Sequence, residues 1–282
     1  MRVPTRVLLP FVLVSFSANS LITRHVVGRH LLDPGLLTSV RFLAGAAALA
    51  VLAVVLRERP AVRRTNWLPA LWLGIYAVCI SYGYEHIGAA AGTFVFYATV
   101  QATLAVYDVA RGNPVPPTRV VGAVVALGGL AVLASSSVST VTALGVLLLA
   151  VTGASWGLYT AAGRGVADPR VASTGNFLAL AVVLVLPTGV LATSDVRVTG
   201  TGLAWAAVMG AGTTAFAYVA WYACQRTLSA TAAGTVQLVI PVLTALGAVV
   251  LLGEQLTAQL AIAGALVACG MWLSGRRPSV SH

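Results

Sequence analysis

Charge is scarce in this chain, and lysine is absent from it. Charged residues make up 9% of the 282 positions, only 7 of them are Asp or Glu, and all 17 basic residues are arginine. Hydrophobic residues supply 59% of the sequence. Because so few polar side chains cannot coat a water-soluble globule of this length, we expect the lipid bilayer to be the solvent of this protein.

Cysteine is rare as well, and its placement indicates neither disulfides nor a metal site. Cys79, Cys224 and Cys269 each lie inside an apolar stretch, without CxxC spacing and without a neighbouring His or Cys. The arginines are scattered between apolar segments rather than gathered in a polar basic domain, so a nucleic-acid partner is not expected despite the net charge of +10. No cofactor and no metal is predicted.

The apolar residues form ten stretches of the length that crosses a bilayer, about 20 residues each. The connections between them are short, so no soluble domain is inserted. The first stretch follows Arg2 and Arg6 like a signal peptide, but nine more spans follow it and we expect an uncleaved helix. The sequence predicts an all-α membrane protein with ten transmembrane helices, at 8–28, 33–56, 67–85, 88–109, 118–136, 140–161, 172–192, 201–223, 231–252 and 257–275.

The distribution of arginine predicts the orientation in the membrane. Short cytoplasmic loops are rich in Arg and Lys. If the amino terminus is cytoplasmic, three arginines fall outside, namely Arg24, Arg29 and Arg197, and Arg41 falls within a span. The other thirteen then fall inside: Arg2, Arg6, Arg57, Arg59, Arg63, Arg64, Arg111, Arg119, Arg164, Arg170, Arg226, Arg276 and Arg277. We therefore expect a multi-pass protein of the cell (inner) membrane with both termini in the cytoplasm.

The two halves of the chain, 1–139 and 140–282, read as inverted copies of one five-helix repeat. In the first half the arginine-rich loops follow the second and fourth spans, whereas in the second half they follow the first, third and fifth spans of that half. At an offset of 142, Gly122 and Gly128 align with Gly264 and Gly270 without a gap, and Ala91-Gly92-Thr93 aligns with Ala233-Gly234-Thr235. Inverted repeats of this kind are typical of secondary transporters, which bind substrate near the midplane where the copies meet.

The segment 234–273, GTVQLVIPVLTALGAVVLLGEQLTAQLAIAGALVACGMWL, carries a proline, a Gly-Glu pair and a later glycine. It resembles the closing signature of the EamA-like family of the drug/metabolite transporter superfamily. Further matching motifs are Phe96-Tyr97-Ala98-Thr99-Val100-Gln101, Ala154-Ser155-Trp156-Gly157, Gly175-Asn176-Phe177-Leu178 and Trp221-Tyr222. The resemblance covers the whole chain in two copies. It implies ten helices and the export of small metabolites, amino acids or drugs, driven by an ion gradient or by the substrate's own gradient.

The first copy departs from the family pattern. Where the second copy has its Gly-Glu pair, the first reads Arg111-Gly112-Asn113-Pro114, and Thr99 stands opposite Pro241. Any role of the family glutamate is therefore carried by Glu254 alone. Glu254 lies in the predicted outer loop between the last two spans, where we expect it to fix the turn.

Polar and aromatic residues share one face of the span 88–109. Phe94, Tyr97, Gln101 and Asp108 follow one another at spacings of three, four and seven, which places them on the same side of a helix. A polar group near the middle of a span needs a partner or water. This face therefore indicates either the wall of a cavity or a hydrogen bond between helices.

We expect the substrate to contact polar and aromatic residues near the middle of the helix bundle. For Tyr159, Trp221 and Tyr222 an interfacial aromatic belt is the alternative interpretation, whereas Trp156 lies deeper. Pro241 lacks an amide hydrogen, so it can bend its helix or expose a carbonyl to the substrate. The predicted substrate-binding residues are Asn19, Arg41, Tyr76, Tyr97, Gln101, Trp156, Tyr159, Tyr218, Trp221, Gln237 and Pro241.

Charged groups within a span are costly and are candidates for function. Arg41, about eight residues into its span, has three interpretations: it reaches the outer interface, binds a substrate carboxylate or pairs with a carboxylate of another helix. Glu85 and Asp108 are the candidates for coupling to protons. The alternative interpretation of Asp108 is a solvated side chain near the cytoplasmic end of its helix. The alternative interpretation of Glu85 is an exposed pair with His86.

One motif of a different class occurs in the chain. Gly153-Ala154-Ser155-Trp156-Gly157 fits G-x-S-x-G, but a nucleophile elbow needs a strand and a sharp turn, and this stretch lies inside an apolar span. The histidines that such an enzyme would need stand at span ends or at the terminus: His25, His30, His86 and His282. The sequence therefore does not indicate an enzyme.

The sequence predicts a carrier that exports a small organic metabolite, amino acid or drug by alternating access. Two alternatives stay open. A translocase of a lipid or lipid-linked intermediate would use the same fold with a lateral opening, and a non-transporting membrane scaffold would tolerate replacement of Trp156, Tyr97 and Gln101 with effects on stability alone. Substrate identity, direction of transport, coupling ion and oligomeric state are not specified by the sequence.

Overall fold

The computed structural model describes residues 4–112, 116–134, 141–164, 166–193, 196–228, 236–237, 239–255 and 257–275. The predicted match at Ala233-Gly234-Thr235, the side chain of Arg119 and the residues Arg2, Arg276, Arg277 and His282 lie outside the described residues. In these ranges the regular secondary structure is helical, with isolated β-bridges and no strand, so the all-α prediction is confirmed. Among the described residues, seven helices are long and apolar enough to cross a membrane.

The helices follow the predicted spans closely, and one of them contains a π-helical segment. The described elements are α1 (Thr5–Gly28), α2 (Pro34–Val55), η1 (Arg64–Asn66), α3 (Trp67–His86), α4 (Ala89–Ala110), α5 (Pro117–Ala134), α6 (Ala143–Ala162), α7 (Pro169–Thr193), α8 (Gly200–Val208), η2 (Met209–Phe216), α9 (Ala217–Gln225), α11 (Val239–Leu252) and α12 (Ala258–Gly275). The predicted span 201–223 is a continuous helix in which η2 has π-helical hydrogen bonding. The helix predicted from residue 231 is described as α11 from Val239 onward.

Short polar residues fix where several helices begin. The carboxylate of Asp33 accepts hydrogen bonds from the N–H groups of Gly35 and Leu36, and Pro34 occupies the first turn of α2. The hydroxyls of Thr142 and Thr199 cap α6 and α8 in the same way. Each cap satisfies amides that have no partner inside their own helix, which sets the ends of the helices inside an otherwise apolar chain.

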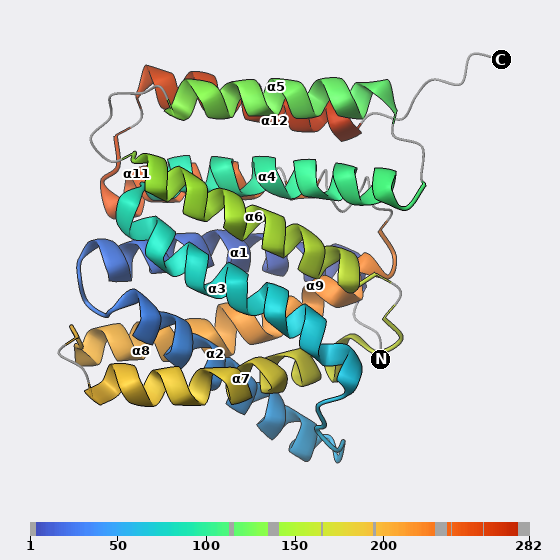
Figure 1. The fold of residues 1–282 in the computed structure, drawn as a ribbon, viewed down its shortest axis with the longest axis vertical. Coiled ribbons are helices and arrows are strands. Elements are labelled where there is room, and N and C mark those ends of the chain that lie inside the picture. The colour runs from blue at the N-terminus through green and yellow to red at the C-terminus, as the bar shows by residue number, and fades with distance from the viewer. Residues whose placement is uncertain are drawn as a thin grey trace.

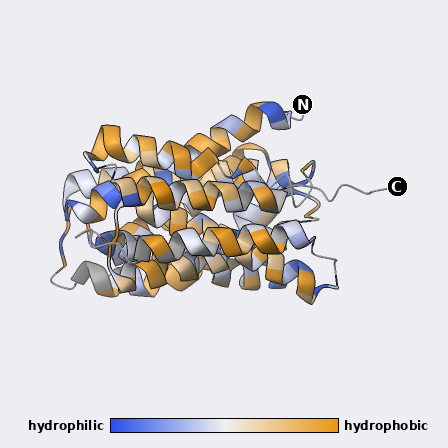
Figure 2. Ribbon diagram, turned by 90° about the horizontal axis from the view of Figure 1, so that it is seen from above, coloured by the Kyte–Doolittle hydropathy of each residue, from blue (hydrophilic) through white to orange (hydrophobic). Residues whose placement is uncertain are grey.

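The helices lie side by side in a flat bundle (Figure 1). The pair α5 and α12 forms one edge and contacts the remainder through α4, while α2 and α7 form the other edge and α1, α3, α6 and α9 lie between. Hydrophobic residues run along the helices, and hydrophilic residues gather toward their ends (Figure 2). This arrangement matches a bundle whose outer surface faces lipid tails.

Glycine allows the closest helix contacts. A Cβ atom at Gly270 of α12 would overlap the carbonyl of Gly122 on α5, so only glycine fits there. A Cβ atom at Gly210 of η2 would likewise overlap the carbonyl of Arg41 on α2. Small residues of this kind let membrane helices approach backbone to backbone. The second contact brings the π-helical segment against the helix that carries the buried arginine.

The two ends of the bundle are held by different contacts. At the end that we call the Glu254 end, antiparallel bridges join Leu32 to Val198 and Ile87 to Val141. At the opposite end, which we call the Arg164 end, ion pairs join Arg170 to Glu58 at 2.8 Å and Arg164 to Asp108 at 3.5 Å, and a 2.6 Å hydrogen bond joins Thr5 to Thr227.

Candidate substrate-binding site

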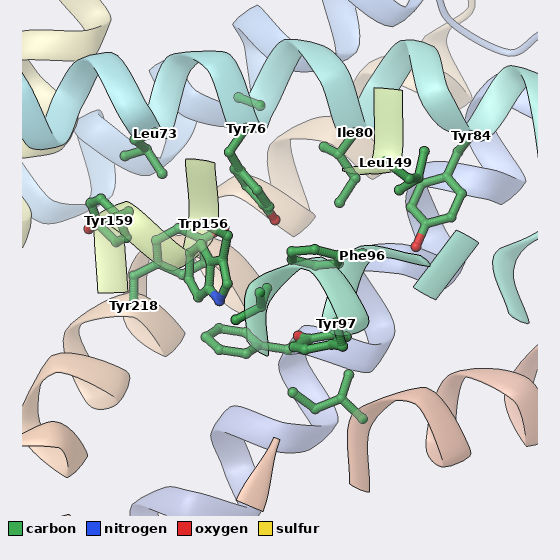
Figure 3. Packing of buried hydrophobic residues seen from close by; sticks show 14 of the residues in the cluster. Leu73, Tyr76, Ile80, Tyr84, Phe96, Tyr97, Leu149, Trp156, Tyr159 and Tyr218 are labelled. Carbon is green, nitrogen blue, oxygen red and sulfur yellow. The ribbon is translucent and has the colours of Figure 1, made fainter. Parts of the chain in front are cut away.

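A small cavity lies in the middle of the bundle. It has a volume of about 10 Å³, which is close to the space that one water molecule needs. Side chains from α1, α3, α4, α6 and α9 converge on it, as Figure 3 shows for several of them. The lining residues are Phe16, Asn19, Ser20, Tyr76, Phe96, Tyr97, Trp156 and Tyr218.

Trp156 is the centre of an aromatic cluster around this cavity. Its ring lies 4.9 Å from that of Tyr218, 5.2 Å from those of Tyr76 and Phe16, and 5.5 Å from that of Tyr159, measured between centroids. Its indole Nε1 donates a hydrogen bond to Gln237 Oε1 at 3.3 Å. The prediction that Trp156, Tyr76, Tyr218 and Gln237 come together is therefore reproduced by the structure.

Arg41 is completely buried next to this cluster. Its Nε donates to Thr214 Oγ1 at 2.8 Å, and its Nη2 donates to Tyr76 Oη at 3.2 Å and to Tyr218 Oη at 3.3 Å. Its Nη1 has no hydrogen-bond acceptor among the described residues. The interpretation that the guanidinium reaches the interface is therefore wrong, and the described part of the chain gives it no carboxylate partner.

The π-helical segment supplies the polar residues that connect Arg41 to α1. Because the Thr214 hydroxyl accepts from Arg41, its own hydrogen is free to be donated, and Asn19 Oδ1 lies 3.3 Å away. Asn19 Oδ1 also accepts from Thr213 Oγ1 at 2.6 Å, and Asn19 Nδ2 donates to the Thr213 carbonyl at 3.0 Å. Runs of π-helix are rare and often mark functional sites.

Other predicted residues lie behind the cavity wall rather than on it. Tyr159 and Trp221 are fully buried, as is Tyr222, so the interfacial-belt interpretation of these three residues is wrong. Gln101 is 8% exposed and has a polar partner, but it does not line the cavity. Buried Pro241 leaves the carbonyl of residue 237 without its helical partner, and that carbonyl accepts instead from the Ile240 N–H at 3.0 Å.

The two carboxylates predicted as coupling candidates lie at opposite ends of the bundle. The expectation of a solvated Asp108 is wrong, because this residue is 7% exposed and its carboxylate faces Arg164. Glu85 and His86 are half-buried at the end of α3, so they do not form an exposed pair. In the described ranges no three His, Cys, Asp or Glu side chains lie close enough together to hold a metal ion.

Glu254 binds the start of a helix far from its own turn. Its carboxylate accepts from the N–H of Ala89 at 2.6 Å and of Ala90 at 3.2 Å, and it lies 3.7 Å from Arg24 Nε. Arg24 in turn donates to the Tyr84 carbonyl at 2.7 Å. Beyond the turn that it was expected to fix, Glu254 joins α1, α4 and the loop after α11, and its charge is favourable at a helix N-terminus.

Sequence reasoning missed Phe16, Ser20, Phe96 and Thr213 as site residues. Phe16 and Ser20 lie four residues apart and share a face of α1 with Asn19, so the helical period contained the signal. The role of Thr213 depends on the π-helical turn, which no residue pattern in the sequence announces.

A larger groove opens at the Arg164 end. It has a volume of about 990 Å³ and lies between the start of α1, the start of α7 and the outer face of α9. Large apolar side chains on its wall are exposed, with Phe11 at 46% and Phe216 at 40%. Its lining also includes Thr5, Asp168, Arg170 and Arg226. We call it the lateral groove.

Comparisons with known proteins agree with this architecture. Residues 143–276 match the EamA-like transporter family. A protein of Pseudomonas aeruginosa named "Uncharacterized protein PA1977" is 37% identical over 260 residues, which cover 91% of this chain and 89% of that protein. A solved structure titled "Crystal structure of protein" is 21% identical, covers 97% of this chain and 98% of its own, and superposes with a TM-score of 0.70, which shows a shared fold. The chain belongs to the EamA-like transporter family of the drug/metabolite transporter superfamily.

Proposed function

We propose that this protein is a secondary transporter that moves a small organic metabolite, amino acid or drug by alternating access, with the central cavity as the substrate site. The observation that carries the proposal is the convergence of aromatic and polar side chains from both halves of the chain on one buried cavity. Phe16, Tyr76 and Tyr97 come from the first half, whereas Trp156 and Tyr218 come from the second.

The proposal includes ten transmembrane helices in two inverted repeats, 1–139 and 140–282. Within the described ranges there are ten helices when η1 is counted with α3 and when α8, η2 and α9 are counted as one. The family match at 143–276 falls inside the second of these repeats. The last helix of each proposed copy, α5 and α12, pack against one another at the same edge, as expected for copies related by a two-fold axis.

The contacts at the two ends support a direction of transport. Two β-bridges and the Glu254 contacts hold the Glu254 end, whereas the Arg164 end is joined by side-chain contacts alone and has the lateral groove beside them. The arginine distribution favours a cytoplasmic Arg164 end and cytoplasmic termini in the inner membrane. A substrate would then load from the cytoplasm and leave when the Glu254 end opens, which is export.

Proton coupling would use a carboxylate whose partner changes during the cycle. Asp108 fits better than Glu85, because its buried pair with Arg164 at 3.5 Å would be broken when the carboxylate takes up a proton. Glu85 has no ion pair with a described arginine.

A flux assay tests the proposed function. Purified protein in liposomes is expected to give saturable flux of at least one member of a panel of amino acids, and a pH gradient is expected to change its rate. Absence of saturable flux for the whole panel would remove the amino-acid proposal. Equal rates with and without the gradient would remove proton coupling.

Substitutions in the cavity test the site itself. Trp156→Ala, Tyr97→Ala and Gln101→Ala are expected to abolish flux while the protein is still expressed and folded, because these side chains form or support the wall. Trp67→Ala is the matched control, since this tryptophan is 45% exposed at the start of α3. Retained flux in all three variants would remove the site and favour a non-transporting scaffold.

The lateral groove favours a second candidate, the translocation of a lipid or lipid-linked intermediate. Exposed Phe11 and Phe216 offer apolar walls for an acyl chain, and Arg170 and Arg226 stand where an anionic headgroup would lie. A fluorescent-lipid translocation assay in the same liposomes separates the two candidates. Lipid movement that survives Trp156→Ala but is lost in Phe216→Ala would favour the lipid candidate.

A further inference from the structure

Arg41 places a permanent positive charge in the middle of the bundle. The guanidinium stays protonated at any pH that a protein tolerates. Its residue is 0% exposed and lies eight positions into α2, away from both helix ends. A charge at that depth is costly unless it is paired or hydrated, so membrane proteins keep such residues where function needs them.

The protein offers this charge only neutral partners. Its acceptors are three hydroxyl oxygens, those of Thr214, Tyr76 and Tyr218, together with the ring of Phe42 at 4.9 Å. Nη1 has no described acceptor at all. Neutral hydroxyls stabilise a guanidinium less than an anion does, since hydrogen bonds between charged groups are the strong ones.

None of the described carboxylates lies in the middle of a helix, as Arg41 does. They stand at or beyond helix ends, and several already have partners at those ends. They are Asp33, Glu58, Glu85, Asp108, Asp168 and Glu254, and the seventh, Asp195, lies outside the described residues. No described protein group therefore neutralises the guanidinium.

Two phenols connect Arg41 to the cavity. Tyr76 and Tyr218 accept from Nη2 and also line the cavity. The two phenols also hydrogen-bond to one another, which uses one of their O–H groups and leaves the other to be donated. An oxyanion in the cavity would accept from this remaining polarised O–H group, or would displace the phenols and reach the guanidinium. The other walls are the rings of Phe16, Phe96, Tyr97 and Trp156, and these rings must move apart to admit a flat apolar body, because the cavity in this structure has room for about one water molecule.

We infer that the central cavity selects small organic anions, with an oxyanion such as a carboxylate held by Arg41 and its two phenols and an apolar or aromatic body held among the rings. This inference rests on the proposed function, because it names the substrate class of the same cavity. Cations are disfavoured there, since the nearest described charge is positive and no described carboxylate lines the cavity.

Three probes that share a body and differ in charge test the inference. 3-Phenylpropionate, 3-phenylpropanamide and 3-phenylpropylamine are titrated against the purified wild-type protein, with tryptophan fluorescence and thermal stability as readouts. We expect the carboxylate to bind about tenfold or more tightly than the amide, because it adds a charge-assisted interaction, and the amine to bind most weakly. Equal or tighter binding of the amide or of the amine overturns the inference.

Variants of Arg41 show whether the guanidinium is the cause. In Arg41→Gln the preference for the carboxylate over the amide is expected to vanish, and in Arg41→Lys part of it is expected to return because the charge is restored. Arg197→Gln removes the same charge from an exposed position and is expected to keep the full preference. If Arg41 only ties α2 to α3 and η2, Arg41→Gln lowers the thermal midpoint and leaves the preference intact, which overturns the inference.

The outcomes separate this inference from the proposed function. Saturable flux of a neutral or cationic compound that persists in Arg41→Gln would leave a transporter and remove the anion site. Binding of none of the probes would also remove the anion site, and the proposed function would then depend on the flux assay alone. If the wild-type protein gives no flux for any compound tested, the proposed function is instead removed.

Discussion

Glu254 is expected to hold the Glu254 end of the bundle closed, and its replacement by alanine is expected to open that end. The carboxylate connects the loop after α11 with the amides of Ala89 and Ala90 and with Arg24, so these contacts must break if the loop and α4 separate. A ligand or side chain shifts a two-state equilibrium only by the contacts that differ between the states. Here those contacts are the two amide bonds and the ion pair.

The size of the shift follows from these contacts. Hydrogen bonds to a charged group contribute about 1.5–3 kcal/mol each, and the freed amides regain part of that when water reaches them. The ion pair adds about 0.5 kcal/mol, because both side chains are partly exposed, at 18% for Glu254 and 21% for Arg24. We therefore expect a net change of about 2 kcal/mol, or a roughly 30-fold larger population open at this end.

Cysteine labelling measures that population. In a background in which Cys79, Cys224 and Cys269 are replaced by serine, Ser20→Cys places a single thiol on the cavity wall. Its reaction with a membrane-impermeant maleimide added from the Glu254 side is expected to accelerate about 30-fold when Glu254→Ala is introduced, and by less in Glu254→Gln, which keeps one acceptor oxygen. If the labelling rates with and without Glu254→Ala agree within twofold in correctly folded protein, Glu254 does not hold this end closed.

Three further tests, two by substitution and one by deletion, concern Asp108, the contact between α5 and α12, and the π-helical turn. Asp108→Asn removes the charge that faces Arg164. We therefore expect stimulation of flux by a pH gradient to disappear while exchange of substrate persists. An unchanged pH response would exclude Asp108 from coupling. Gly270→Leu forces α5 away from α12 and is expected to lower the thermal midpoint by several degrees, whereas Gly128→Leu, which meets open space, is expected to leave it unchanged. Deletion of Gly212 removes the extra residue of the π-helical turn and rotates Thr214 by about 100° about the helix axis. We therefore expect flux to be lost in a protein that still folds. Normal flux would contradict a role for the π-helical turn in transport.

The sequence predicted the helices well because they depend on local composition. The ends of α2, α6 and α8 are set by capping residues that a reader of the sequence can find, such as Asp33, Thr142 and Thr199. The residues around Trp156 were also predictable, since bulky aromatic and polar side chains in the middle of a span have few places to go other than the bundle interior.

Long-range partners could not be predicted in the same way. Glu254 contacts Ala89 across 165 positions, and Asp108 contacts Arg164 across 56, so neither pair has a local signal. Burial of Asp108 depends on how α4 meets the end of α6. The link between Arg41 and Thr214 depends on the π-helical turn and on the close approach that Gly210 allows.

A density map of the protein with its transported compound would show whether the substrate occupies the central cavity. Once the flux assay has identified a compound, we expect density for it in the central cavity between α1, α3, α4, α6 and α9, in contact with Trp156 and within hydrogen-bond distance of Tyr76 or Tyr218. Density in the lateral groove beside Arg226, with the rings around Trp156 packed as they are in this structure, would contradict the claim that substrate crosses the membrane through the central cavity.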